Sequence, residues 1–336
     1  MASLINDLLN PKNLPDSSQE VSLVQTHISL VFIGDEFVYK VKKPVNYGFL
    51  DFTTLEKREY FCHQELILNR RLAKELYLDV LPIYFDGQTH SFLSEKGPIV
   101  DFAVRMKKVP PERLMKNVFF RGELNEEHLK RTAEILANFH KKAGRSGEID
   151  AFGQPGRFRV NTDENFEQTV KYIGQTIDLN NYNRIKKWTD DFYHQNDSLF
   201  QERIKSQKIR DCHGDLHMEH VCLINPLAVI DCIEFNDRLR YSDTFADIGF
   251  LMMDLDYMEG SALAEKLWEF YRAKTGDSEN HPLLTFYKVY RAYVRGKVNS
   301  FQLDDKAISP NKKKEAVQSA RKYFNLALKY IDGVGD

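Results

Sequence analysis

The chain has 336 residues, of which 42% are hydrophobic and 29% are charged, and its formal net charge is −2. This composition is typical of a globular protein, and the small net charge gives no reason to expect nucleic acid as the main ligand. No run approaches the roughly 18 apolar residues that a membrane helix needs. The first residues lack the basic and apolar segments of a signal peptide, so we expect a cytoplasmic protein without a membrane partner.

The segment 21–43 is rich in β-branched and aromatic residues and predicts strands, with Gly34 at a tight hairpin turn. In the last of these strands, residues 37–42, Lys40 and Lys42 share one face because side chains alternate along a strand. Two lysines beside apolar neighbours are suited to holding phosphates. Alternatively, they are solvated charges at the edge of a sheet.

Next in the chain, Thr53 and Glu56 form a capping box that opens a helix running to about Lys74. This helix carries Glu59 and Glu65, and either of them could reach back to a lysine of the strand.

Three further strands and a proline-rich break complete the first part of the chain. The strands are predicted at residues 80–85, 91–93 and 99–107. They predict an antiparallel sheet with one long helix. The break Val109-Pro110-Pro111 is where a hinge between two lobes would fall. We therefore expect an N-lobe over residues 1–109 and a C-lobe over 110–336, as the chain is too long for one core.

Beyond the prolines the pattern is helical. Helices are predicted at 112–120, from Asn125 to Gly144, at 163–173, 181–204, 245–258, 262–274 and 282–301, and from Pro310 with Ser309 as its N-cap. The stretch 144–161, which holds four glycines and Pro155, predicts a surface loop.

Within this helical part lies a polar stretch, residues 210–220, followed by two short apolar runs. The runs 221–224 and 227–230 predict an antiparallel hairpin in which His220 lies opposite Asp231. Because proline fits poorly into a two-residue turn, Pro226 leaves room for a register shift of one residue.

This hairpin would gather four titratable side chains at its open end: Asp215, His220, Asp231 and Glu234. Carboxylates brought so close repel one another unless a cation lies between them. The sequence therefore predicts a metal and phosphate site.

Five features together resemble the protein-kinase-like fold: the strand with Lys40, a helix glutamate, a hinge, the element His213-Gly214-Asp215-x-His217, and Ile230-Asp231. Within that fold the resemblance is to the aminoglycoside phosphotransferase and choline kinase-like family. It covers roughly residues 20–300 and extends to an uncharacterised bacterial branch that is often fused to a P-loop kinase domain. It implies an α+β, bilobal fold, with an antiparallel sheet and one long helix in a small N-lobe and a larger, mainly helical C-lobe.

The resemblance implies a role for each residue in the C-terminal part of the site. Asp215 would accept the proton of a substrate hydroxyl, and Asp231 would bind the metal that bridges the β- and γ-phosphates. His213 is the second catalytic candidate, or else a packing and hydrogen-bonding residue. His220 stands where a metal-binding asparagine is usual, so either it joins Glu234 and Asp231 as a ligand or it hydrogen-bonds Asp231.

The resemblance also implies nucleotide contacts in the N-terminal part. Lys40 would contact the α- and β-phosphates and be held by Glu65, with Lys42 as the alternative lysine. Ser29 and Met106 are further predicted contacts, although the turn at Ser29 lacks the glycine-rich phosphate loop. The implied cofactors are ATP and Mg²⁺, with Mn²⁺ as an alternative.

Three functions follow as hypotheses. The first is an ATP-dependent kinase that acts on the hydroxyl of a small molecule. The second is a nucleotide-binding pseudokinase with a regulatory role. The third is a metal-dependent phosphohydrolase with His213, Asp215, His217 and His220 as ligands. The substrate and the oligomeric state stay open, and a group of acidic residues around Asp254 either lines a cleft for a cation or is solvated.

Overall fold

The computed structural model describes residues 2–93, 96–279, 281–305 and 308–333. The chain forms two compact units. The first, called the sheet unit here, comprises residues 1–122 and 219–237. The second, the helical unit, comprises residues 123–218 and 238–336.

The sheet unit is built on six antiparallel strands in the order β1-β2-β3-β6-β4-β5. Their bounds are β1 Ser22–Gln25, β2 Ser29–Ile33, β3 Phe37–Lys42, β4 Tyr77–Phe85, β5 His90–Ser91 and β6 Ile99–Lys107. Gly34 donates its N–H to the carbonyl of Phe37, which confirms the tight turn predicted between β2 and β3. One face of the sheet carries a buried cluster that includes Phe32, Tyr39 and Val41.

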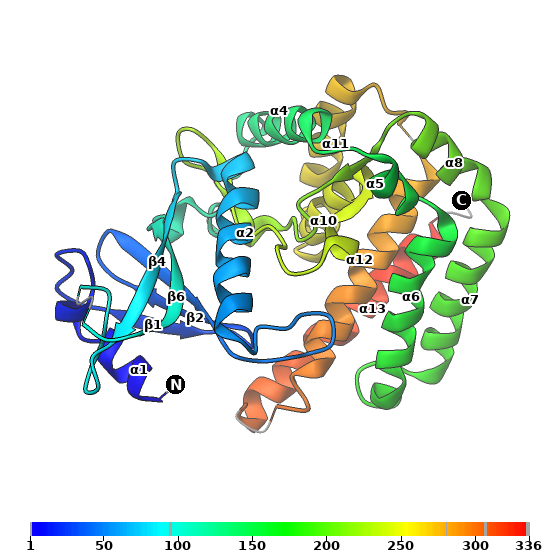
Figure 1. Ribbon diagram of the computed structural model, residues 1–336. Coiled ribbons are helices and arrows are strands. Elements are labelled where there is room, and N and C mark those ends of the chain that lie inside the picture. The colour runs from blue at the N-terminus through cyan, green and yellow to red at the C-terminus, as the bar shows by residue number, and fades with distance from the viewer. Residues whose placement is uncertain (1, 94–95, 280, 306–307, 334–336) are drawn as a thin grey trace. The chain divides into compact units, whose positions relative to one another are not determined.

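Helix α2, Leu55–Ala73, packs against β4 and β6 and covers the sheet (Figure 1). It confirms the predicted long helix, but its N-cap is Thr54, whose side chain accepts the N–H of Lys57. The predicted cap, Thr53, is wrong by one residue because its hydroxyl donates to Asp51 instead.

Shorter elements complete the sheet unit: α1 Ala2–Leu8, η1 Pro11–Asn13, η2 Pro111–Arg113, α3 Met115–Phe120, η4 Met218–His220 at the junction with the helical unit, β8 Val221–Cys222 and β9 Ala228–Val229. Strands β8 and β9 form the predicted antiparallel hairpin, but Val221 pairs with Val229 and not with the predicted Ile230. The register is shifted by one because five residues join the strands. The first of these, Leu223, leaves the ladder and donates its N–H to the carbonyl of Arg113.

The helical unit contains the remaining elements: α4 Glu126–Lys142, α5 Gly147–Ala151, α6 Pro155–Thr169, η3 Val170–Tyr172, α7 Leu179–Gln195, α8 Asp197–Lys205, β7 Ile209–Asp211, α9 Asp237–Arg240, β10 Tyr241–Asp243, α10 Thr244–Tyr257, α11 Ser261–Thr275, α12 Pro282–Phe301 and α13 Pro310–Asp332. Strands β7 and β10 pair antiparallel. The predicted bounds of α12 and the predicted caps of α4 and α13 are confirmed.

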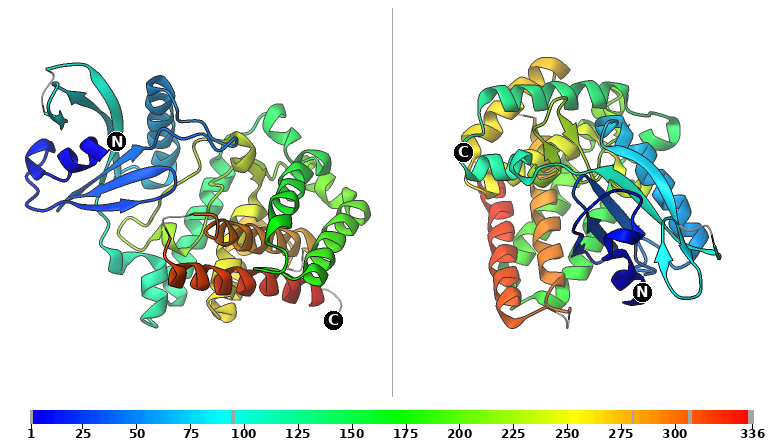
Figure 2. Two further views of the ribbon diagram at one scale, coloured as in Figure 1. Left: turned by 90° about the horizontal axis from the view of Figure 1, so that it is seen from below. Right: turned by 90° about the vertical axis from the view of Figure 1, so that its left-hand side faces the viewer.

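Helices α12 and α13 run alongside each other, and α10 packs on α12 (Figures 1 and 2). Their shared core includes Phe250, Tyr293 and Phe324. Gly296 allows the close approach of α13, since a Cβ atom there would lie 2.7 Å from the ring of Phe324.

The stretch 144–161 is largely helical, so the predicted surface loop is wrong. Ser146 caps α5 by accepting the N–H of Ile149. Pro155 stands at the first position of α6, where proline begins a helix because no backbone N–H is needed there. The ring of Phe158, one turn further on, is buried.

Among the helices that the structure describes, none combines the length and the low polarity that crossing a membrane would require.

Candidate active site

The lysines of β3 lie on one face of the sheet, as the alternation of side chains predicted. In the ladder, Lys40 stands opposite Val31 and Lys42 opposite Ser29. Val41, between the lysines, is buried in the cluster on the other face.

Glu65 of α2 binds both lysines. Its Oε1 lies 2.9 Å from the Nζ of Lys40, and its Oε2 lies 2.7 Å from the Nζ of Lys42. Burial alone would raise the pKa of the Glu65 carboxyl, but the two ammonium groups lower it below its usual value. Glu59 is exposed on the helix, so the glutamate that reaches the lysines is Glu65.

Lys42 forms a second ion pair, with Glu234. Only 1% of the Lys42 side chain and 5% of the Glu234 side chain are exposed. The Nζ of Lys42 also lies 4.9 Å from the centre of the Phe52 ring. Burial by itself would lower the pKa of Lys42, whereas Glu234 and Glu65 raise it above the ordinary value. The carboxylate of Glu234 is thus engaged by Lys42, and its predicted role as a metal ligand stays a prediction.

Lys40 instead contacts Asp231, with 2.5 Å between Nζ and Oδ1. Asp231 has a left-handed backbone with φ of 63°, and its N–H donates to the hydroxyl of Tyr77. The Nε2 of His220 lies 3.4 Å from the other carboxylate oxygen, Oδ2. Since 43% of its side chain is exposed, Asp231 can reach a ligand from solution.

The segment after Asp231 is attached to the rest of the sheet unit. Cys232 donates its N–H to Asn69 of α2 at 2.8 Å. The side-chain amide of Asn236 donates to the carbonyl of Phe49 at 3.0 Å. Asp231 therefore projects from a segment that is held on both sides.

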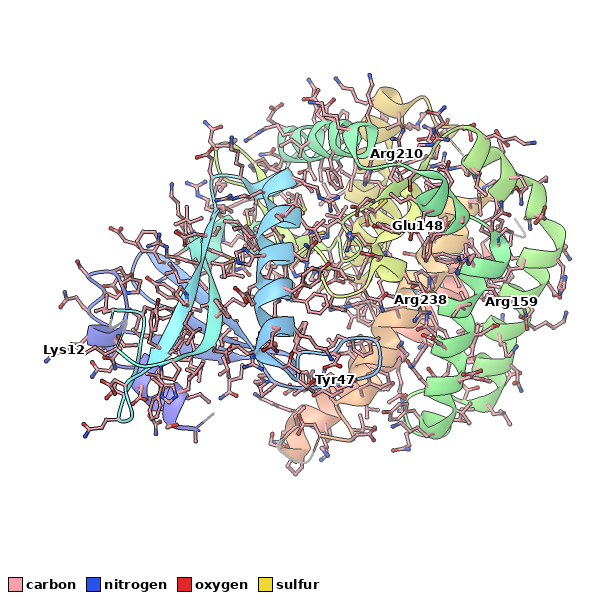
Figure 3. All side chains as sticks on the ribbon, in the orientation of Figure 1. Lys12, Tyr47, Glu148, Arg159, Arg210 and Arg238 are labelled. Carbon is pink, nitrogen blue, oxygen red and sulfur yellow. The ribbon has the colours of Figure 1, made fainter. Side chains whose placement is uncertain are left out.

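Aromatic rings reinforce this attachment, and the sequence interpretation missed them. Tyr47, labelled in Figure 3, lies in the loop between β3 and α2 and stacks on Phe49. The Phe49 ring in turn lies 5.9 Å from Phe235. In the sequence, the signal for this ring cluster was Phe235, the aromatic residue directly after Glu234.

Ser29 and Met106, the two further predicted nucleotide contacts, take no part in the ion pairs described above. The hydroxyl of Ser29 is buried and has no hydrogen-bond partner within the described ranges. Met106 of β6 stands opposite Val38. In the turn before Ser29, the hydroxyl of Thr26 accepts the N–H groups of Ile28 and Ser29. The predicted nucleotide contacts of Ser29 and Met106 stay predictions.

The sheet unit thus brings together six of the predicted residues, namely Lys40, Lys42, Glu65, His220, Asp231 and Glu234. A reachable carboxylate offers the oxygen ligands that Mg²⁺ prefers, and an ammonium group beside it suits a phosphate. The residues present therefore fit a metal and nucleotide. Asp215 and His213 belong to the helical unit, and their predicted place beside Asp231 stays a prediction.

In the helical unit, Asp247 of α10 braces the loop that carries Asp215. Its buried carboxylate accepts the N–H of His213 at 2.7 Å and of Gly214 at 2.9 Å. Burial alone would raise the pKa of Asp247, but the hydrogen bond from His140 and these neighbours lower it to about 2. Asp247 thus fixes the backbone at the start of this loop.

Asp215 is the reachable carboxylate on this loop, with 36% of its side chain exposed. Its N–H donates to the Nδ1 of the buried His213, and its Oδ2 lies 3.6 Å from the Nε2 of His217. The loop continues to Met218, whose N–H donates to Asp254 at 2.9 Å. The arrangement presents one carboxylate on a fixed backbone, which suits proton transfer.

Replacing Asp247 with Asn should cost about 2 to 4 kcal/mol of unfolding free energy at pH 7, because it removes a charged acceptor from two buried N–H groups. The pKa of Asp247 is lowered from 3.8 to about 2. Its contribution, about 2 kcal/mol, is therefore present above pH 4 and is lost as the pH falls through 2.

Urea unfolding measured at pH 7 and at lower pH checks this prediction. The difference in unfolding free energy between wild type and Asp247→Asn should become smaller as the pH falls. Asp191→Asn, at an exposed pair with Lys187, is the control and should change stability by less than about 0.5 kcal/mol. A gap that widens in acid would contradict the assignment.

Comparisons with known proteins place this geometry in context. No family model matches the sequence. Uncharacterized proteins of Mycobacterium tuberculosis and Mycobacterium bovis are 30% identical over 312 residues, which is 93% of this chain and 60% of theirs. The chain thus spans 60% of the length of these relatives.

Two solved structures share the fold. A choline kinase from Cryptosporidium parvum matches with a TM-score of 0.56 at 12% identity, over 98% of this chain and 95% of that one. A choline/ethanolamine kinase family protein from Mesorhizobium loti matches with a TM-score of 0.51 at 13% identity, over 93% and 92%. The chain therefore has the protein-kinase-like fold. The predicted likeness to the choline kinase-like family and the predicted α+β class are confirmed at the level of the fold.

Proposed function

We propose that the protein is an ATP-dependent phosphotransferase that acts on the hydroxyl group of a small molecule. The observation that carries this proposal is the arrangement in the sheet unit in which Glu65 holds Lys40 and Lys40 contacts the reachable carboxylate of Asp231. The fold shared with two choline kinase-type structures supports it.

In this proposal Lys40 binds the α- and β-phosphates of the nucleotide, and Glu65 keeps its amino group in place. Asp231 holds the divalent metal, which would neutralise charge on the β- and γ-phosphates when bound. His220 orients the Asp231 carboxylate, because imidazole is a poorer ligand for Mg²⁺ than oxygen is.

Asp215 acts as the base. The substrate oxygen forms a bond to the γ-phosphorus, the bond to the ADP oxygen breaks, and the hydroxyl proton passes to the Asp215 carboxylate. His213 holds the loop through the N–H of Asp215 and does not exchange a proton with substrate.

A nucleotide-binding module without catalysis is the second candidate. It is favoured by the turn before Ser29, where Thr26 already occupies two N–H groups that would otherwise face a phosphate. Turnover of ATP that depends on Asp215 would exclude it. The phosphohydrolase is not proposed, because His213 is buried with its Nδ1 engaged by the Asp215 N–H.

Thermal unfolding with ATP tests the nucleotide site. Saturating ATP with Mg²⁺ at about 100 times the dissociation constant should stabilise the wild type by about 2.7 kcal/mol. In Asp231→Asn, the part of this stabilisation by ATP that requires the metal should be lost, because an amide is a weaker ligand than a carboxylate. A titration of Mg²⁺ and Mn²⁺ at fixed ATP measures that part.

The control is Asp101→Asn, at a buried carboxylate of the same unit that pairs with Arg58. It should lower stability without changing the metal requirement. An equal metal response in Asp231→Asn and wild type would remove Asp231 from the proposal. ADP formation over a panel of amino alcohols, sugars and nucleosides then identifies acceptors.

A further inference from the structure

Helix α12 in the helical unit carries two arginines one turn apart, Arg291 and Arg295, and Arg291 is turned toward α10. The guanidinium of Arg291 lies 4.7 Å from the centre of the Phe250 ring. The Phe250 ring also lies 5.6 Å, between ring centres, from His217, in the loop that carries Asp215. Since residues four apart share a helix face, Arg295 lies on the face of α12 that is turned to this loop.

The two arginines differ in how their donors are used. Arg291 is buried and donates its Nε–H to the carbonyl of Ala246 at 3.1 Å. The Nε of Arg295 is enclosed as well, yet it has no acceptor among the residues that the structure describes. The Arg295 guanidinium lies 5.6 Å from the centre of the Tyr323 ring. A guanidinium with an enclosed and unused donor is costly unless a ligand supplies the acceptor.

The groups that act electrostatically on Arg295 include the proposed base, Asp215. Burial alone would lower the pKa of Arg295, but Tyr323, Asp215 and Asp254 raise it, so the side chain stays charged. Asp254 already accepts the N–H of Met218. Among the described residues, no carboxylate accepts a hydrogen bond from the Nε of Arg295.

The acidic residues that could have served a cationic substrate are engaged elsewhere. Asp256 binds Lys288 at 2.7 Å and the hydroxyl of Tyr330 at 2.6 Å. Glu259 is exposed and lies 3.4 Å from Lys322. Arg295 differs from these acidic residues, because it is a cation whose enclosed Nε has no acceptor among the described residues.

We propose that Arg295 binds an anionic group, a carboxylate or a phosphate, of the substrate. This substrate is the molecule whose hydroxyl proton Asp215 accepts. The substrate is then a hydroxylated anion and not a cation of the choline type. A planar guanidinium suits both anions because it can offer two parallel N–H donors. This assignment rests on the proposed phosphotransferase function.

Acceptors matched in size but not in charge test the proposal. ADP formation with saturating ATP and Mg²⁺ is measured for a panel of hydroxy acids and sugar phosphates. Their neutral and amino counterparts are assayed beside them, for example D-glycerate, glycerol 3-phosphate, glycerol and ethanolamine. The wild type should prefer one of the two anionic classes of acceptor. Comparing the hydroxy acids with the sugar phosphates shows whether the preferred anion is a carboxylate or a phosphate.

Arg295→Gln should lower kcat/KM for that anionic acceptor by about 10- to 100-fold, the loss expected for a charged hydrogen bond. The change for the neutral counterpart should be much smaller. Arg295→Lys should restore part of the loss. Arg184→Gln, at an exposed arginine paired with Asp332 in the same unit, is the control and should leave the preference unchanged.

A preference for neutral or cationic acceptors would overturn the assignment while leaving the phosphotransferase in place. If Arg295→Gln lowered kcat/KM equally for all acceptors, that result would also overturn the assignment, because Arg295 would then serve only as an internal counter-ion. If no acceptor is phosphorylated, the proposed phosphotransferase function fails. Calorimetric titration of the protein with D-glycerate and with inorganic phosphate then tests whether Arg295 binds an anion. Absence of binding, or binding that Arg295→Gln leaves unchanged, would sink the proposal, whereas Arg295-dependent binding would support it.

Discussion

Asp215→Asn is expected to slow phosphoryl transfer by about 10²- to 10⁴-fold, the usual worth of a positioned general base. Asparagine keeps the size of the side chain but cannot accept the hydroxyl proton. The loop itself should persist, because its backbone is held by Asp247 through the N–H groups of His213 and Gly214. The measurement is kcat for ADP formation with the acceptor that the panel identifies.

Nucleotide binding should survive this substitution, since the residues proposed to hold the nucleotide belong to the sheet unit. The matched control is Asp163→Asn, at a partly exposed carboxylate of α6 that pairs with Arg159. It should leave kcat unchanged. If Asp215→Asn transfers phosphate as fast as the wild type, Asp215 is not the base.

Lys42→Met is expected to lower the unfolding free energy by about 3 to 5 kcal/mol, because it leaves a buried carboxylate without its partner. Lys42 and Glu234 are both almost fully enclosed, and Glu65 is fully buried. Lys40→Met should cost less stability, since its partner Asp231 is 43% exposed, but it should weaken ATP binding more. Urea unfolding and nucleotide titration of both variants measure the two effects.

The double variant Lys42→Met/Glu234→Leu separates loss of a charge pair from loss of volume. It should recover part of the stability lost in Lys42→Met, because a buried ion pair can be replaced by apolar side chains at little cost. Should Lys40→Met prove more destabilising than Lys42→Met, the division of roles between the two lysines is the reverse of the one proposed.

Local patterns were sufficient where an element depends on near neighbours in the chain. The hairpin turn at Gly34, the cap of α4 at Asn125 and the bounds of α12 follow from turn chemistry, capping and helical periodicity. The same kind of reasoning went wrong at Pro155, because proline both interrupts a helix and begins one, and the surrounding glycines favoured the first interpretation.

The register of β8 and β9 needed information from beyond the hairpin. The bond between Leu223 and Arg113 removes Leu223 from the ladder, and Arg113 is more than 100 positions earlier in the chain. A pattern within a dozen residues carries no trace of such a partner.

The sequence by itself determined the alternation that puts Lys40 and Lys42 on one face, the succession of a strand-rich and a helix-rich part, and the likeness to the kinase-like fold. Only the tertiary structure decided that Glu65 and not Glu59 meets these lysines, and that Lys40 contacts Asp231 while Lys42 contacts Glu234. Periodicity tells which way a side chain points, but which partner it meets depends on distances between segments as far apart as residues 40 and 231, and those distances are set by packing.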